Sequence, residues 1–153
     1  MNRQIIPDVI DGRQVLSCFD PSERVSEAAA VMAERNIGAV LVMKDRRLHG
    51  IVTERDLVRR VLAQGLAPQD VTLGEVMTAQ PDTILPGEPA SEALIRMRRG
   101  NYRHLPVVDE AGVLHGMVSI RDLYAVVQEQ LSADLIACET MIYGESYGTA
   151  GAV

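Results

Sequence analysis

The sequence predicts a mixed α+β fold of the α/β class, built from two β-α-β-β-α repeats that pack with pseudo-two-fold symmetry. The first observation is an internal repeat, because GIVTERDL at residues 50–57 returns as GMVSIRDL at residues 116–123. The second is that SEAAAVMAERN at residues 26–36 returns as SEALIRMRRGN at residues 91–101. Strand-like apolar runs lie between these segments in both copies. Each copy therefore carries the same elements in the same order.

The elements of each repeat follow from local patterns. A short β run ends in a Pro-containing turn, and a helix follows that Ser26 or Ser91 opens, with an acid in its first turn. Apolar residues recur at helical spacing within this helix, as at Ala28 and Met32. Two strands and a closing helix complete the unit, at residues 39–43, 48–52 and 54–63 in the first repeat and at 105–108, 113–118 and 120–131 in the second.

The repeats set the expected domain organisation. Residues 5–63 form repeat 1, residues 64–70 form a linker with Gly and Pro, and residues 71–131 form repeat 2. Because a unit of about 60 residues buries little surface alone, we expect the two to form one globule. The tail at residues 132–153 matches neither repeat, and we expect it to be partly helical and frayed or disordered from Gly144 on.

Composition excludes several classes of function. The net charge of −6 argues against a general nucleic-acid binder, so we do not expect a nucleic-acid partner. Lys44 is the single lysine, and the arginines that carry the other positive charges suit planar contacts with phosphate, although genomic base composition is an equal explanation. No segment suits a signal peptide or a membrane span, so we expect a cytoplasmic protein without a membrane partner. Cys18 and Cys138 have no metal-ligand spacing and are expected to be buried free thiols.

The repeated element S/T-x-x-D has two interpretations. Thr53 with Asp56, and Ser119 with Asp122, have the spacing of a helix capping box, in which the hydroxyl is the N-cap and the acid occupies N3. The functional interpretation is that the helix N-terminus favours a phosphate while the carboxylate accepts the hydrogens of a ribose diol. The recurrence of the motif at equivalent places in two halves that pack together favours a function.

These motifs resemble the CBS domain family, named after cystathionine β-synthase. The G-h-V-[S/T]-x-x-D-L element, in which h is apolar, the strand LPVVDE and the opening GEVMT at residues 74–78 carry the resemblance, which covers roughly residues 5–130. The first repeat departs from the pattern, since PDVID at residues 7–11 replaces GEVMT and Leu41 replaces Pro106. The resemblance implies a stand-alone module with two clefts that bind AMP, ADP, ATP, S-adenosylmethionine or related molecules as regulatory ligands.

The resemblance also implies the site residues, since each cleft takes its ribose-binding acid from one repeat and its base-binding residues from the other. Cleft A would be formed by Thr53, Asp56, Thr72, Met77, Thr78, Tyr102, Arg103 and His104. Cleft B would be formed by Ser119, Arg121, Asp122, Val9, Ile10, Ile37, Gly38 and Ala39. Cleft A is expected to bind more tightly, because cleft B has Gly38 and Ala39 where cleft A has Arg103 and His104.

The remaining expectations concern charge, catalysis and assembly. Arg96 and Arg99 are expected to form a solvated helix face. No paired carboxylates near a histidine, nucleophile elbow, phosphate-binding loop or metal cluster stands out, so we expect neither an enzyme nor a catalytic cofactor. The alternative function is an interaction or scaffold subunit whose clefts are empty and whose motifs are only caps. A homodimer is expected, because the helices at residues 54–63 and 120–131 are apolar on more than one face.

Overall fold

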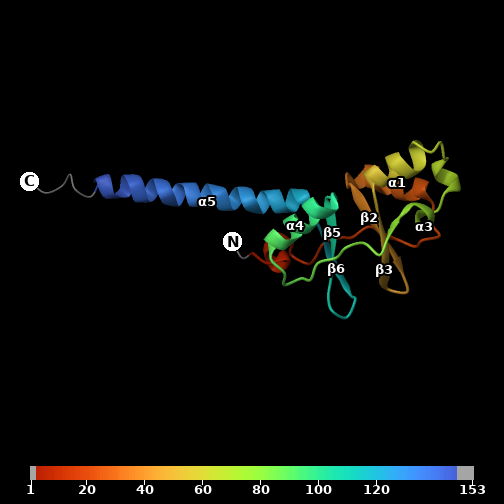
Figure 1. The fold of residues 1–153 in the computed structure, drawn as a ribbon, viewed down its shortest axis with the longest axis horizontal. Coiled ribbons are helices and arrows are strands. Elements are labelled where there is room, and N and C mark those ends of the chain that lie inside the picture. Colours follow the sequence, from red (N-terminus) through yellow and green to blue (C-terminus); the bar gives the residue numbers. More distant parts are fainter. Residues whose placement is uncertain (1–2, 148–153) are drawn as a thin grey trace, which may run out of the picture.

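The chain folds into a body of two halves from which one long helix, α5 (Ile120–Tyr147), extends (Figure 1). The structure is a computed structural model that describes residues 3–147, with side chains described as far as residue 142. The predicted β-α-β-β-α order is present in both halves, so the predicted fold class is confirmed. Within the described residues, no helix has the length and apolar character that crossing a membrane requires.

The first half contains a four-stranded sheet with the strand order β1-β2-β3-β4. β1 runs parallel to β2, and the other two pairs are antiparallel. The elements of this half that come from repeat 1 are β1 (Cys18–Phe19), α1 (Val25–Arg35), β2 (Ala39–Lys44), β3 (Arg47–Thr53), α2 (Glu54–Leu57) and the π-helix η2 (Val58–Leu62). A 3-10 helix η3 (Pro68–Asp70), a helix α3 (Leu73–Val76) and strand β4 (Thr78–Ala79) follow.

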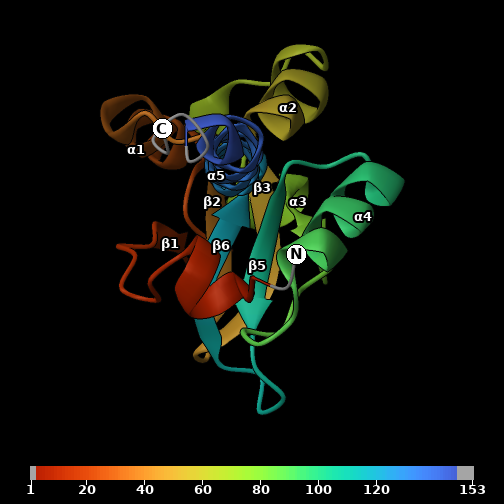
Figure 2. The same cartoon turned by 90° about the vertical axis from the view of Figure 1, so that its left-hand side faces the viewer.

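The second half repeats this arrangement with fewer residues in strands. An antiparallel pair, β5 (His104–Val108) and β6 (Leu114–Ser119), follows helix α4 (Ala90–Gly100). An isolated parallel bridge between Ile84 and Val107 takes the place that β1 has in the first half. Figure 2 looks along α5 and shows β5 and β6 in front of β2 and β3. The two sheets contact one another through Ala39, Leu41 and Ile51 on one side and Leu114 and Met117 on the other.

The segments that open the two repeats are exchanged between the halves. Leu73 and Val76 of α3 belong to the core of the first half, and Ile5 of η1 (Ile5–Val9) belongs to the core of the second. Backbone hydrogen bonds fix both exchanges: the Leu73 N–H donates to the Glu23 carbonyl at 2.9 Å, and the Ile5 N–H donates to the Glu88 carbonyl at 2.9 Å. Each half therefore closes its core with a segment from the other.

Three predicted helix ends and one prediction about the thiols were wrong. α1 and α4 begin one residue before Ser26 and Ser91, because the preceding residues are extended and held in backbone bridges to the exchanged segments. α5 continues past residue 131 to Tyr147, since no glycine or proline interrupts the chain between residues 120 and 143. Cys18 and Cys138 are free, as expected, but both are exposed. The frayed end predicted from Gly144 is helical as far as Tyr147, and the remaining residues lie outside the described part of the chain.

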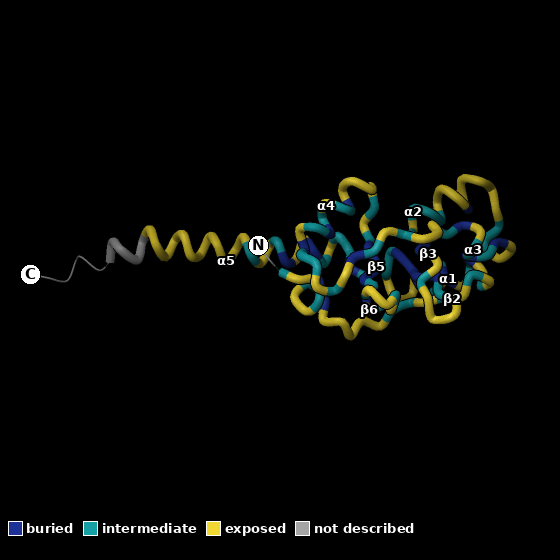
Figure 3. The backbone as a smooth tube through the Cα atoms, turned by 60° about the horizontal axis from the view of Figure 1, so that its bottom comes forward, coloured by how far each residue is buried: buried dark blue, intermediate teal, exposed yellow. Residues whose placement is uncertain are grey.

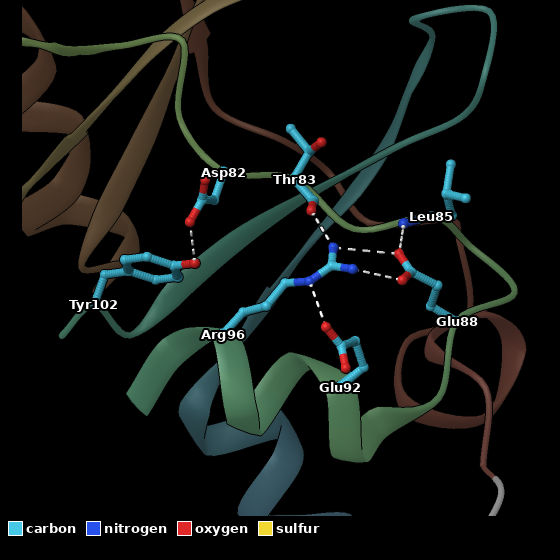
Figure 4. Close-up of polar contacts among 7 residues, drawn as sticks. All are labelled: Asp82, Thr83, Leu85, Glu88, Glu92, Arg96 and Tyr102. Carbon is cyan, nitrogen blue, oxygen red and sulfur yellow. Dashed lines mark hydrogen bonds and ion pairs between the residues drawn. The ribbon is translucent and has the colours of Figure 1, made fainter. Parts of the chain in front are cut away.

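Arg96 on α4 is an ion-pair centre and does not belong to a solvated face, contrary to the prediction. Its guanidinium donates to Glu88 at 2.6 Å, to Glu92 at 2.9 Å and to the Thr83 carbonyl at 2.6 Å (Figure 4). The Arg96 side chain is only 22% exposed. The network holds the turn before α4 against the helix. Its Glu88 also accepts from the Leu85 N–H at 2.7 Å.

We predict that Arg96→Met lowers the free energy of unfolding by about 1–2 kcal/mol, because charge-assisted hydrogen bonds of a half-buried guanidinium are lost while Glu88 and Glu92 lose their cation. Urea unfolding measures this change. Arg99→Met is the control, since Arg99 is exposed on the same helix and should change stability by less than about 0.5 kcal/mol. Equal losses in the two variants would contradict the role of the network.

Candidate functional site

A cleft of about 1060 Å³ lies where the two halves meet. Both repeats line it, with the strand ends of β2, β3, β5 and β6 and the first turns of α2 and α5 around it. The strand-to-helix junctions of the halves are fixed in the same way. The Glu54 N–H donates to the Gly38 carbonyl at 3.0 Å, and the Ile120 N–H donates to the Arg103 carbonyl at 2.8 Å. The cleft therefore follows the pseudo-two-fold symmetry of the fold.

Two asparagines turn the chain into this cleft. Asn36 and Asn101 follow α1 and α4 and adopt left-handed backbone conformations, with φ of 53° and 55°. Asparagine tolerates this conformation better than most residues, so it serves as the helix C-cap where a sharp reversal is needed. Both residues line the cleft. The reversal brings the segments 37–39 and 102–104 into the lining, where β2 and β5 begin.

Thr53 and Asp56 form a capping box at the N-terminus of α2. The Asp56 N–H donates to Thr53 Oγ1 at 3.2 Å, while Asp56 Oδ2 accepts from the Thr53 N–H at 2.9 Å and from the Thr53 hydroxyl at 3.0 Å. Among the described residues, Asp56 Oδ1 has one polar neighbour, Arg60, at 3.8 Å. The structural interpretation of the motif is thus confirmed. One carboxylate oxygen nevertheless remains free to accept a hydrogen bond from a ligand.

Ser119 and Asp122 repeat this geometry at the N-terminus of α5. Asp122 Oδ2 accepts from the Ser119 N–H at 2.7 Å and from its hydroxyl at 2.8 Å. Ser119 lines the cleft together with Arg121, whereas Asp122 does not belong to the described lining. The two capping boxes are therefore alike as caps but differ in their access to the cleft.

The lining of the cleft has an excess of positive charge. Five arginines and three acids contribute to it: Arg55, Arg59, Arg60, Arg103, Arg121, Glu54, Asp56 and Asp82. Arg55 and Arg60 are held by backbone carbonyls, those of Asn101 at 3.0 Å and Val76 at 2.8 Å. The side chains of Arg59, Arg103 and Arg121 make no hydrogen bond or ion pair with the side chains and backbone described for residues 3–142. In a chain of net charge −6, this local excess of positive charge makes the cleft electrostatically favourable for an anion.

His104 packs against Gly38 of the other repeat. A Cβ atom at residue 38 would lie only 3.3 Å from His104 Cε1, so glycine allows this approach. Burial lowers the pKa of His104 below its ordinary value; Glu54 and Asp122 oppose this shift, while Arg103 and Arg121 add to it. A neutral imidazole at this place can donate one hydrogen bond and accept another.

Tyr102 closes one side of the cleft through a hydrogen bond. Its hydroxyl donates to Asp82 Oδ2 at 2.7 Å, which joins the turn after α4 to the segment after β4 (Figure 4). Burial and the hydrogen bond to Asp82 raise the pKa of Tyr102 to about 12. The phenol is therefore a constant donor, and its ring presents an apolar surface to the cleft.

The structure brings most of the predicted site residues into this one cleft. The predicted residues that line it are Thr53, Asp56, Thr78, Tyr102, Arg103, His104, Ile37, Gly38, Ala39, Ser119 and Arg121. Five others lie elsewhere: Thr72 caps α3 with Glu75, Met77 packs against Gly50, Val9 packs against the core of the second half, Ile10 is buried in that core, and Asp122 does not belong to the lining. The geometry does not by itself test ligand contacts, so the assignment stays a prediction.

Sequence reasoning missed two extended segments of the lining. Residues 14–17 before β1 and residues 80–82 after β4 form parts of the wall. Their sequences, QVLS and QPD, share no motif, and only the strand pairing of the segments that follow them shows that they are equivalent. Within the described residues, no group of three His, Cys, Asp or Glu side chains is placed to hold a metal ion.

Comparisons with known proteins agree with this geometry. Residues 1–63 and 73–129 match the family model of the CBS domain. The chain is 38% identical over 127 residues to the Meiotically up-regulated gene 70 protein of Schizosaccharomyces pombe, covering 77% of this chain and 17% of that protein. The chain spans less than two thirds of the length of the first curated relatives that it matches.

Solved structures show the same fold. A putative signal-transduction protein with CBS domains from Burkholderia ambifaria is 37% identical with a TM-score of 0.71, over 76% of this chain and 84% of that chain. A CBS domain protein from Pyrobaculum aerophilum complexed with AMP is 28% identical with a TM-score of 0.69, over 78% of this chain and 94% of that chain. The family match, which extends over both repeats, and these structures show that the chain belongs to the CBS domain family and is a CBS domain pair.

Proposed function

We propose that this CBS domain pair is a regulatory module that binds an adenosine-containing nucleotide in the cleft. The observation that carries the proposal is that Asp56, with one free carboxylate oxygen, shares the cleft with Arg59, Arg103 and Arg121. A carboxylate that accepts from a diol and guanidiniums that bind phosphate are the polar groups that a ribose phosphate requires. The related Pyrobaculum aerophilum protein with AMP supports the same ligand class.

The two predicted clefts are proposed to be unequal, with cleft A the tighter one. Asp56 faces the cleft, while its counterpart Asp122 lies outside the lining. The family resemblance assigns Arg103 and His104 to cleft A, and the matching residues of repeat 1 are Gly38 and Ala39. Of the five predicted residues that lie elsewhere, Thr72 and Met77 were predicted for cleft A and Val9, Ile10 and Asp122 for cleft B, and we keep them as candidates for a ligand-bound arrangement.

The proposed module regulates and does not catalyse, because the two motif acids do not share one lining and therefore do not form an acid–base pair. We also keep the prediction of a cytoplasmic location.

The alternative is an interaction or scaffold subunit with empty clefts, in which both acids serve only as caps. The capping hydrogen bonds in the two repeats favour this alternative, and ligand-induced thermal stabilisation with AMP, ADP, ATP and S-adenosylmethionine separates the two.

The first expected result concerns Asp56. The chain should bind an adenosine nucleotide with micromolar-class affinity, on the order of −7 to −8 kcal/mol. Asp56→Ala should weaken this binding about ten- to hundredfold in calorimetry, because the ribose hydroxyls lose their charged acceptor. Asp122→Ala should leave the affinity largely intact.

The control for lost capping is Glu75→Ala. Glu75 accepts from the Thr72 N–H at 2.8 Å and from its hydroxyl at 2.9 Å, so this variant also loses a capping box, but outside the cleft. Stability should fall in both variants, whereas affinity should fall only in Asp56→Ala. An equal loss of affinity in Asp56→Ala and Glu75→Ala would show that the motif acts only through helix stability, and the reverse order of the two aspartates would show that the clefts are assigned wrongly.

The second expected result concerns Arg103. Arg103→Ala should weaken AMP and ATP about tenfold and change adenosine affinity by less than about twofold, because the guanidinium contacts phosphate alone. Parallel titrations with adenosine, AMP and ATP measure the difference. Arg99→Ala, on the exposed face of α4, is the matched control. A parallel loss for adenosine and the nucleotides would remove the phosphate assignment.

We further propose that the module is a homodimer. The helices at residues 54–62 and 120–131 bury one face in their own halves, with Val61 and Leu123 each 1% exposed, and leave Val58, Leu62 and Leu131 more than half exposed. A helix that is apolar on two faces covers a second partner. Light scattering at micromolar concentration should give the mass of two chains, and the mass of one chain would refute the proposal.

A further inference from the structure

The distal part of α5 is not buried against any other segment that the structure describes. Every residue from 131 to 142, called the arm here, is exposed, and the helix leaves the body at the end of the second half (Figures 1 and 3). Isolated helices of this length are marginal in water, because most helix stability in proteins comes from the packing of an apolar face. The arm therefore needs a surface to cover it.

The arm carries a continuous apolar stripe that suits such a surface. Its residues follow a spacing of three or four positions, which places them within about 80° of arc on a helix with 100° per residue. They are Tyr124, Val127, Leu131, Leu135, Cys138 and Ile142. Val127 is half-buried and the other five are exposed. The stripe thus begins on the body and continues along the whole arm.

The charges beside the stripe are all negative. After Arg121 the chain contains no lysine or arginine, while Asp134 and Glu139 flank the stripe on its two sides. Two arms that pair with each other would bring these carboxylates together without a compensating cation. Like charges at such short distances oppose association, so the arm fits an apolar surface that carries arginine.

Such a surface lies on η2 of the first half. Val58 is 55% exposed and Leu62 is 64% exposed, and they lie one turn apart on one face. Arg59 and Arg60 lie beside them, both are exposed, and Arg59 makes no ion pair within the described residues. The arm cannot reach η2 of its own chain, because η2 belongs to the half of the body that faces away from the arm (Figure 1).

We propose that the arm of one chain packs on η2 of a second copy, with Leu131, Leu135 and Cys138 against Val58 and Leu62, and with Asp134 or Glu139 beside Arg59. The contact is reciprocal, so that each copy gives one arm and receives one, as a two-fold dimer requires. This inference rests on the proposed dimer and specifies which surfaces form it. It does not rest on the proposal of nucleotide binding.

A cross-linking experiment on the full chain tests where the arm lies. Cys18→Ser leaves Cys138 as the single thiol, and Val58→Cys or Leu62→Cys then adds a second one on η2. Under mild copper-phenanthroline oxidation, we expect a covalent dimer when either η2 substitution is present and none in Cys18→Ser alone. Gln69→Cys, at an exposed position in the linker, is the control for random collisions and should give no covalent dimer.

Each other outcome overturns the inference in a distinguishable way. A covalent dimer of Cys18→Ser alone means that two arms pair through Cys138. A dimeric mass without cross-linking at either η2 position means that the dimer exists but the arm does not pack on η2. A monomeric mass refutes the arm contact together with the proposed dimer, whereas the nucleotide titrations decide the ligand proposal separately.

A charge exchange tests the proposed pairing without cysteines. Asp134→Arg combined with Glu139→Arg should weaken the dimer at least tenfold, because the arm then meets Arg59 with like charge. Arg59→Glu alone should weaken it in the same direction. All three substitutions in one chain should recover at least half of the loss in the logarithm of the dimerisation constant, as measured by sedimentation. A further loss of dimer affinity in the triple variant would overturn the inference.

Discussion

Each half of this protein completes its core with a segment that belongs to the other repeat, and this exchange determines the rest of the structure. A repeat of about 60 residues buries too little apolar surface to be stable alone. With Leu73 and Val76 in the first core and Ile5 in the second, neither half can separate without opening both cores. The cleft owes its fixed shape to this constraint, because its walls come from both halves. A ligand bound there contacts two units that cannot move apart independently.

Each capping box stabilises its helix through one carboxylate oxygen, so the second oxygen of the same carboxylate can accept a hydrogen bond from elsewhere. Oδ2 of Asp56 and Oδ2 of Asp122 accept the hydrogen bonds of the caps. The symmetry of the fold duplicates this arrangement, but the surroundings of the two acids differ. An acid at this position can cap its helix without lining the cleft. Asp122 is such a case, because it accepts the capping hydrogen bonds but does not belong to the lining.

The sequence was sufficient to predict features that depend on short-range patterns. The repeat, the order of elements and the capping boxes follow from motifs within a few positions, and the resemblance that these motifs carry implied eleven of the residues that line the cleft. The exchange of the opening segments could not be predicted in this way, since it joins residues such as Ile5 and Glu88 that are distant in sequence. Arg96 was misjudged for the same reason, because its helix neighbour Glu92 is visible in the sequence while its contact with Thr83 is not. The length of α5 was missed because the repeat ends at residue 131 although no helix-ending residue is present there.

Arg59 connects the two proposals, because it lines the cleft and also stands beside Val58 and Leu62 on η2. A guanidinium that pairs with a carboxylate of a partner's arm is less available to a phosphate in the cleft, and the converse holds equally. If both contacts use this side chain, nucleotide binding and dimerisation oppose each other, and thermodynamic linkage requires the two effects to be equal in size. Adenosine, which lacks phosphate, would not compete for Arg59. A dimer that weakens with ATP but not with adenosine would therefore identify the arginine as the point where the ligand acts on assembly.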